Sequence, residues 1–247
     1  MKVPERYNYL GVELNATNLQ QTIEYLLQYN YDNVNYISFP DSSVIANAQH
    51  DEALRKILNQ ALLTLPDGLP SALYARYKGF KSVSTVSGFL LCNSLLSSNL
   101  SHYFLGSSAD ALEKIKNNLE HKFPNAKVLG YCSPPFHELD YFKKGLLLEN
   151  ELEEINRLQP DLVWIGISSP KQDYFINAHV SKLKHGILLG VGGVFDYLSE
   201  NKKKSPEWVK KIGFRWLWRL LKEPRRLGPK YWTVIKFYFS IIWKKIG

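Results

Sequence analysis

Asp67 is the residue of this chain whose setting best suits acid–base chemistry. It stands in Leu65-Pro66-Asp67-Gly68, directly after a short apolar run that predicts a β-strand. Proline stiffens the chain before the carboxylate and glycine permits a turn after it, so the carboxylate is held on a firm frame. It could take a proton from a hydroxyl nucleophile. The same residues also suit an Asx-turn or a helix N-cap, and the spacing leaves both interpretations open.

Residues 167–173, Ile-Ser-Ser-Pro-Lys-Gln-Asp, place a second group of polar side chains behind an apolar run. Pro170 can begin a helix whose free backbone amides face an anion, and Lys171 adds positive charge. Gln172 can read the polar edge of a base or a sugar. An ordinary capped helix start explains the pattern equally well.

Residues 190–196, Gly-Val-Gly-Gly-Val-Phe-Asp, form a glycine-rich exit from another apolar run. Gly192 and Gly193 would let the backbone approach a phosphate closely, and Phe195 and Asp196 follow. The segment is not the dinucleotide fingerprint, because the third glycine is absent and the run is the last predicted strand rather than the first. By itself it indicates a turn that admits a phosphate.

These three segments share one place in the predicted fold, because each follows an apolar, β-branched or aromatic run. Segments with apolar residues at helical spacing lie between the runs, at 18–29, 43–59, 109–121 and 149–158. This alternation predicts an α/β fold with a Rossmann-like, doubly wound, mostly parallel sheet. The six predicted strands are 34–39, 62–65, 103–105, 127–131, 162–167 and 187–191.

Ligands of such sheets bind beyond the carboxyl ends of the strands. The residues found there are small, polar and glycine-rich, which suits a nucleotide or a sugar. For Ser42, Ser107 and Ser108 the sequence favours the role of helix caps over a role in the site. We therefore expect the site at the strand ends, with Asp67 in it.

Several familiar sites are missing from the sequence. It has no Asp-x-Asp pair, no P-loop and no clustered His or Cys with metal-ligand spacing, so no metal and no cofactor are expected. Cys92 and Cys132 are too few for a disulfide framework and are expected to be reduced thiols in a cytosolic protein. No leader pattern precedes the first helix, and no run reaches the ~18 apolar residues of a spanning helix.

The last fifth of the chain differs from the rest in composition. Residues 202–247 carry 14 Lys and Arg against two acids, and they hold five of the six Trp. The spacing predicts a helix over 206–222 with a cationic stripe and a second helix over 231–245. Cationic charge mixed with large aromatics suits an anionic membrane surface or a lipid-linked phosphate. We therefore divide the chain into a body, residues 1–201, and a helical appendage, residues 202–247.

At this point the chain resembles the WecG/TagA/CpsF glycosyltransferases, bacterial enzymes of surface-polysaccharide and teichoic-acid linkage-unit synthesis. The resemblance covers residues 31–231. It rests on Pro66-Asp67-Gly68, on Pro170-Lys171-Gln172-Asp173, on Gly192-Gly193-Val194-Phe195-Asp196, and on Lys204-Ser205-Pro206-Glu207-Trp208 continuing through Gly213, Trp216, Arg219, Leu220, Glu223, Pro224, Arg225 and Arg226.

The resemblance implies an inverting, metal-independent hexosyltransferase. Its donor would be a UDP-sugar, of the N-acetylmannosamine type or another hexose, and its acceptor a polyprenyl-diphosphate-linked sugar. Asp67 would be the base, while Arg215, Arg219, Arg225 and Arg226 would stabilise the leaving diphosphate. The other motif residues form the expected substrate-binding set: Gly68, Lys171, Gln172, Gly192, Gly193, Phe195 and Asp196.

The resemblance also implies a cytoplasmic enzyme held peripherally on the inner face of the plasma membrane. Its expected partners are the two substrates and an anionic membrane surface, with a homo-oligomer left open and no nucleic acid. The chain departs from the family pattern at two places. Phe39 stands nearest to a common Asn, and Gly88-Phe89-Leu90 replaces Gly-[Ser/Thr]-Asp.

Three other functions compete with this interpretation. An inactive relative that acts as an assembly partner fits the two departures. A nucleic-acid-binding protein would use the basic, aromatic tail but leaves the strand-end residues unexplained. A nicotinamide-dependent oxidoreductase would use the same kind of sheet, but the dinucleotide fingerprint is absent.

Overall fold

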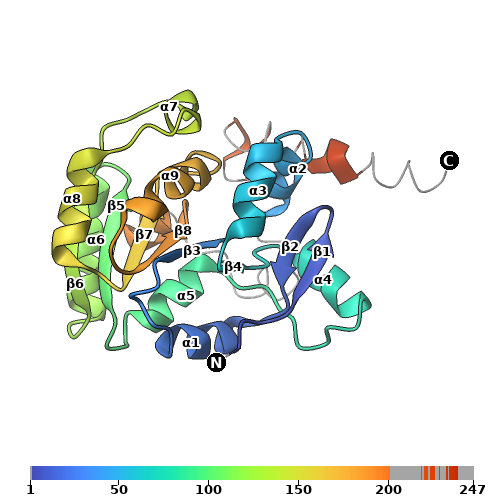
Figure 1. Ribbon diagram of the computed structural model, residues 1–247, viewed down its shortest axis with the longest axis horizontal. Helices are drawn as coiled ribbons and strands as arrows, with labels where there is room; N and C mark the ends of the chain where they lie inside the picture. The colour runs from blue at the N-terminus through green and yellow to red at the C-terminus, as the bar shows by residue number, and fades with distance from the viewer. Residues whose placement is uncertain are drawn as a thin grey trace.

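The computed structural model describes residues 2–200 and, in the tail, residues 218, 220–221, 223–225, 228, 232 and 234–238. Its centre is a six-stranded sheet in which every pairing is parallel, in the order β4-β3-β8-β7-β5-β6. The predicted Rossmann-like, doubly wound fold is confirmed, and Figure 1 shows the helices packed on both sides of the sheet.

All six predicted strands form within one or two residues of their expected bounds. Each holds alternating side chains that point to opposite faces, so that Leu162 and Trp164 enter one core while Val163 and Ile165 enter the other. Both faces are therefore buried, as a parallel sheet requires. The strands are Asn35–Ser38 (β3), Leu63–Thr64 (β4), Ser101–Gly106 (β5), Lys127–Cys132 (β6), Leu162–Gly166 (β7) and Ile187–Gly190 (β8).

The helices divide between the two cores. One face of the sheet packs against Leu19–Leu27 (α1), Gly88–Leu95 (α5), Ala109–Lys122 (α6) and Val194–Leu198 (α10). The other face packs against Ser42–Ala48 (α2), Glu52–Gln60 (α3), Leu139–Lys143 (α7), Glu149–Leu158 (α8) and Lys171–His179 (α9), which the 3₁₀ turn Val180–Lys182 (η1) follows.

The single helix predicted over 43–59 is wrong, because the structure has two helices, α2 and α3. Asp51 interrupts the helical pattern and caps α3 by accepting a hydrogen bond from the Leu54 amide at 3.0 Å. Its carboxylate also accepts from the Tyr174 hydroxyl, at 2.6 and 2.7 Å. A tertiary contact with α9 thus stabilises the break.

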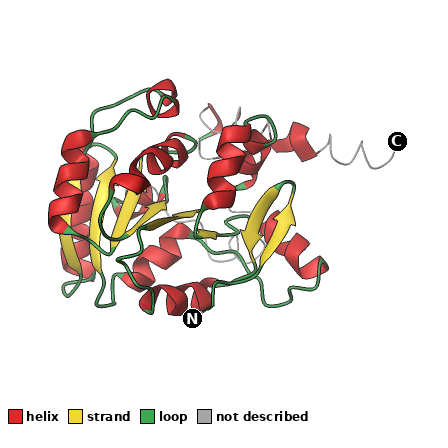
Figure 2. Cartoon of the chain, in the orientation of Figure 1, coloured by secondary structure: helices red, strands yellow, loops and turns green. Residues whose placement is uncertain are grey.

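An antiparallel hairpin and helix α4 lie beside the edge strand β4, and neither was predicted. The hairpin pairs Arg6–Tyr9 (β1) with Val12–Asn15 (β2), and α4 spans Leu69–Tyr77. The Tyr7 hydroxyl donates to the Ser71 carbonyl at 3.2 Å, and the Tyr9 and Tyr74 rings lie 5.2 Å apart. Figure 2 shows the hairpin as a pair of strands separate from the main sheet.

Most described residues of the tail are helical, and the tail contacts the body at this same edge. The Tyr238 hydroxyl lies 3.0 Å from that of Tyr9 and donates to Ser42 Oγ at 3.1 Å, while Phe237 packs against the adjacent core. Of the helices that the structure describes, none is long and apolar enough to cross a membrane. The division of the chain into a body, residues 1–201, and an appendage, residues 202–247, stays a prediction.

Two glycines allow β5 and β7 to approach closely at their carboxyl ends. Gly106 pairs with Gly166 and has φ +130°. A Cβ at Gly106 would lie 2.5 Å from the carbonyl carbon of Gly166, and a Cβ at Gly166 would lie 2.5 Å from the ring of Phe195. Larger residues at either position would displace the strand ends.

Substituting Gly106 tests this constraint, with Gly79 as the matched control. Gly79 also has a positive φ, +99°, but its Cβ would meet nothing within 4 Å. We expect Gly79→Ala to lower the free energy of unfolding by about 1 kcal/mol through backbone strain alone. Gly106→Ala should cost about 3 kcal/mol, because a steric clash adds to that strain. Urea unfolding measures both, and equal losses would contradict the proposed contact.

Candidate active site

A cleft of about 830 Å³ lies at the carboxyl ends of the strands, where the sequence predicts the site. Residues from every strand end of the sheet contribute to it. The lining includes Phe39 and Asp41 after β3, Asp67 after β4, Ser107 and Ser108 after β5, Ser133 and Pro134 after β6, Ser168, Ser169, Lys171 and Gln172 after β7, and Gly192, Gly193, Phe195 and Asp196 after β8.

Asp67 lies half-buried in the lining of this cleft. The N-cap position of α4 belongs to Gly68, so the helix-cap interpretation of Asp67 is wrong. Asp41 lines the cleft from the neighbouring strand. Its carboxylate caps α2 by accepting from the Ser43 and Val44 amides at 2.9 and 3.1 Å. Two carboxylates, one of them fixed by a helix, therefore lie at the β3–β4 side of the cleft.

Lys171 contacts the β6–α7 loop, on the side of the cleft away from Asp41 and Asp67. Pro170 occupies the N-cap position of α9, as expected, and Lys171 is the first helical residue. The Lys171 ammonium donates to the His137 carbonyl at 2.9 Å, lies 3.7 Å from the Glu138 carboxylate and stands 4.0 Å from the centre of the Phe136 ring. The ammonium therefore fixes the β6–α7 loop beside the cleft.

Gln172 forms part of the floor. Its side chain is 5% exposed, and its amide nitrogen donates to the Gly190 carbonyl at 2.8 Å. Its Oε1 is buried and has no hydrogen-bond partner among the described residues. A Cβ at Gly192 would lie 3.1 Å from this oxygen, so Oε1 faces the glycine turn. A buried acceptor without a partner costs about 1–3 kcal/mol, and a ligand donor would remove that cost.

The glycine turn after β8 provides the backbone surface expected of it. Gly192 has φ +48°, and Gly193 stands at the N-cap position of α10. Phe195 is buried against Gly166, with its ring 5.9 Å from that of Phe104, so it supports the floor from below. Asp196 is half-buried in the lining.

Asp173 is a buried carboxylate under the cleft. It is 3% exposed and accepts a hydrogen bond from the Ser169 hydroxyl. Burial is the main cause that raises the pKa of Asp173 to about 6, with a smaller contribution from the nearby charge of Asp41. Hydrogen bonds from the Ser169 hydroxyl and from the Asp173 backbone amide act in the opposite direction. Asp173 thus titrates near neutral pH directly behind Lys171 and Gln172.

Some predicted residues lie elsewhere, and some residues of the site were not predicted. Gly68 and Arg225 are not among the lining residues, and Arg215, Arg219 and Arg226 lie outside the described residues. The β6–α7 loop and the start of α5 enter the site only through tertiary structure, although Ser87-Gly88 is a helix-start signal in the sequence. The unpredicted lining includes Phe39, Ser87, Phe89, Phe136, His137 and Phe142. Asp41 directly follows the first predicted strand, so it belongs to the strand-end residues that the sequence places there.

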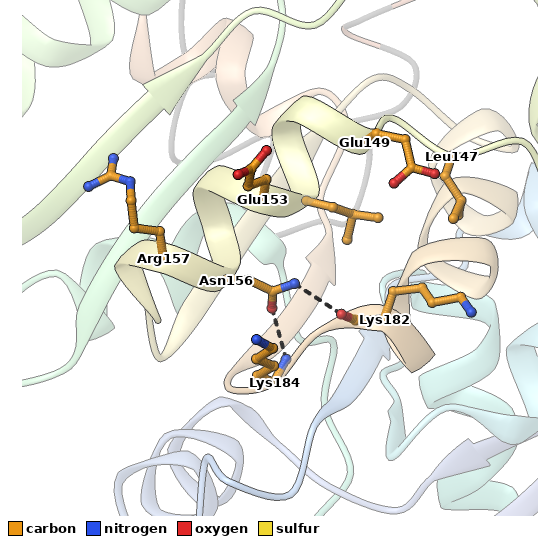
Figure 3. Close-up of a pocket in the computed structure, with 8 residues that line it drawn as sticks. Leu147, Glu149, Glu153, Asn156, Arg157, Lys182 and Lys184 are labelled. Atoms are coloured by element: carbon orange, nitrogen blue, oxygen red, sulfur yellow. Dashed lines mark hydrogen bonds between the residues drawn. The ribbon is translucent and has the colours of Figure 1, made fainter.

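A second cavity, of about 620 Å³, lies away from the strand ends, between α8 and η1. Figure 3 shows Asn156 at its base, where the side chain donates to the Lys182 carbonyl at 3.0 Å and accepts from the Lys184 amide at 2.9 Å. Asn156 therefore links α8 to the turn after α9. The cavity is open to solvent, and its lining carries both acidic and basic side chains. This lining favours no particular class of ligand.

The fold and the cleft define a doubly wound α/β protein that binds its ligand at the strand ends. Within the described residues, no group of three or more His, Cys, Asp or Glu side chains is placed to hold a metal ion. The glycosyl transferase WecG/TagA/CpsF family model matches residues 7–247, so the chain belongs to this family and is a glycosyltransferase.

Curated relatives are identical to this chain at about a quarter of the aligned positions. It is 26% identical to a protein of Bacillus subtilis (strain 168), over 89% of this chain and 87% of the relative. It is 24% identical to one of Staphylococcus aureus (strain MW2), over 92% and 91% of the two chains. Both relatives are named N-acetylglucosaminyldiphosphoundecaprenol N-acetyl-beta-D-mannosaminyltransferase.

The raised pKa of Asp173 predicts a pH-dependent loss of stability. A carboxyl whose folded pKa, about 6, exceeds its unfolded value of 3.8 binds more protons in the folded state, so stability falls as pH rises between these values. Over this whole range the free energy of unfolding falls by about 3 kcal/mol. Asp173→Asn keeps an acceptor for Ser169 but cannot ionise. Its free energy of unfolding should therefore fall less than that of the wild type between pH 4 and pH 7.

Urea unfolding at pH 4, 5, 6 and 7 measures this difference. The exposed Asp110 on α6 provides the control, because Asp110→Asn should leave the pH slope of the wild type unchanged. Parallel pH curves for the wild type and Asp173→Asn would show that Asp173 is not the buried titrating group.

Proposed function

We propose that this glycosyltransferase moves a hexose from a UDP-sugar to a polyprenyl-diphosphate-linked sugar, with inversion and without a metal ion. The observation that carries the proposal is the position of Asp67, a half-buried carboxylate in the strand-end cleft that does not serve as a helix cap. The names of the relatives support the acceptor class, since those proteins are named for a diphosphoundecaprenol-linked N-acetylglucosamine.

The donor would lie over the centre of the sheet. The cleft, at about 830 Å³, falls within the range of about 300–1,000 Å³ typical of small-molecule sites. The backbone of Gly192 and Gly193 would approach the diphosphate, Gln172 Oε1 would accept from a hydroxyl or amide of the donor, and Lys171 would add positive charge at the rim. The donor sugar is of the N-acetylmannosamine type in the relatives' names, and the same type or another hexose is proposed here.

Asp67 would act as the general base. Its carboxylate takes the proton of the acceptor hydroxyl while that oxygen forms a bond to the anomeric carbon. The bond between this carbon and the diphosphate oxygen breaks, and its electron pair leaves with UDP. A single in-line displacement of this kind inverts the anomeric centre.

The tail would complete the site beside Asp67. Tyr238 contacts Ser42 at the start of α2, next to Asp41, and a Cβ at Gly68 would lie 3.7 Å from the same Ser42 Oγ. These contacts support a tail that lies against the acidic side of the cleft. Arg215, Arg219, Arg225 and Arg226 would then neutralise the leaving diphosphate, and the aromatic side of the tail would hold the enzyme on the inner face of the plasma membrane.

The base assignment is tested by Asp67→Asn, which keeps the shape of the side chain but cannot take a proton. We expect kcat to fall by about 10²–10⁴-fold while the Kd for UDP changes little. Asp110→Asn, outside the cleft, serves as the control and should keep full turnover. If turnover of Asp67→Asn stays within a few-fold of the wild type, Asp67 is not the general base. A wild type that binds UDP-sugars without turnover would favour the inactive relative.

The role of the tail arginines is tested at Arg225, which is exposed in the structure. Loss of one group that stabilises the transition-state charge lowers kcat by about 10²–10³-fold. We expect this loss for Arg225→Ala, and partial recovery for Arg225→Lys, which restores the charge. Steady-state kinetics on a short-chain acceptor measure both variants. Equal kcat for the wild type and Arg225→Ala would exclude Arg225 from this role.

A further inference from the structure

Helix α4 exposes a continuous apolar stripe to solvent. Leu69, Leu73 and Tyr77 are 42%, 51% and 83% exposed, and their spacing of four residues places them on one side of the helix. The opposite side is buried on the hairpin through Ser71, Ala72 and Ala75. We call the exposed side the α4 face, formed by Leu69, Pro70, Leu73, Arg76 and Tyr77. Single exposed apolar residues are ordinary, whereas a contiguous apolar stripe marks an interaction surface.

The charged residues of α4 and of the segment directly after it are all cationic. The chain has no acidic residue between Asp67 and Asp110. Arg76, Lys78 and Lys81 are all exposed at the end of α4 or just beyond it. The partner of this surface is therefore expected to be apolar and anionic together. An anionic lipid leaflet has both properties.

Two other occupants fit this chemistry less well. In a two-fold contact between copies of this chain, the α4 face would meet itself, and its cations would oppose like charges. A nucleic acid would match the cations, but the leucine side chains offer no stacking surface for its bases.

The α4 face is near a second apolar and cationic surface. Tyr74 of α4 contacts Tyr9 of the hairpin, and Tyr9 contacts Tyr238 of the tail. Figure 1 shows α4, the hairpin and the described tail helix at the same end of the molecule. Trp232 and Ile235 of the tail are also exposed, and Lys236 lies over the Trp232 ring. One flat leaflet would bury more apolar area by contacting both surfaces than by contacting either.

We propose that the α4 face is a membrane-docking surface that inserts Leu69, Leu73 and Tyr77 into an anionic leaflet. Helix α4 begins two residues after Asp67, so docking holds the acidic side of the cleft toward the leaflet. In this orientation a lipid-linked acceptor would be delivered to Asp67, and that role rests on the proposed function. The docking itself does not, because it is measured without substrate.

The test uses the full chain with the double substitution Leu73→Glu/Tyr77→Glu. Partition is measured by sedimentation with phosphatidylglycerol–phosphatidylcholine vesicles and with phosphatidylcholine vesicles. We expect at least about a tenfold loss of affinity for the anionic vesicles, because two apolar anchors are replaced by charges that the leaflet repels. The matched control is Leu27→Glu/Leu129→Glu, at side chains 50% and 40% exposed on α1 and β6, which should bind as the wild type does.

Unchanged vesicle affinity overturns the proposal. A change from dimer to monomer in analytical ultracentrifugation, with vesicle affinity retained, also overturns it and assigns the face to a second copy. Leu73→Ser/Tyr77→Ser repeats the measurement if the glutamate variant does not fold.

Turnover separates this proposal from the proposed function. The double variant should keep wild-type turnover on a soluble short-chain acceptor and lose turnover on a long-chain acceptor in vesicles. If vesicle affinity falls as expected while the wild type transfers no sugar to either acceptor, the docking surface stands and the proposed function fails.

Discussion

The site depends on how closely the backbones of the central strands approach one another at their carboxyl ends. Gly106, Gly166 and Phe195 form a stack in which neither glycine has room for a Cβ: the nearest atoms would be 2.5 Å away in both cases. Because Phe195 belongs to α10, the stack also fixes the glycine turn that precedes this helix. Beside the Gln172 side chain, the floor of the cleft therefore exposes backbone at its glycines, which lets a ligand approach main-chain groups.

Helix α9 connects this floor to the rim through three consecutive residues. Lys171 reaches the β6–α7 loop, Gln172 bonds the end of β8, and Asp173 is buried behind them. Successive helical residues point about 100° apart, so one helix start can serve three environments. The helix is itself fixed to α3 by Tyr174 and Asp51. A substitution at the start of α9 would consequently alter both the floor and the rim of the cleft.

The strands could be predicted from the sequence, because buried parallel strands are continuous apolar runs. The location of the cleft could be predicted as well, because the carboxyl ends of parallel strands meet at one edge of the sheet. The break at Asp51 could not, because Tyr174, whose hydroxyl bonds its carboxylate, comes from a distant segment. Helix α4 was missed for a different reason: its exposed side carries Leu69, Leu73 and Tyr77, so no polar face marks the helical period. Phe136 and His137 belong to the cleft only through tertiary packing, and nothing local in the sequence distinguishes them from other loop residues.

The strand order gives the cleft two chemically different sides. Asp41 and Asp67 follow β3 and β4, at one edge of the sheet, while the glycine turn and Lys171 follow β8 and β7 at its centre. In the proposed reaction, proton removal from the acceptor takes place at the edge and departure of the diphosphate nearer the centre. The proposed acceptor is attached to a membrane, so it would reach the cleft from outside the edge strand of the sheet. That edge is where the hairpin, α4 and the returning tail lie. The position of β4 at the edge would thus account for both the place of the proposed base and the side from which a lipid-linked hydroxyl would reach it.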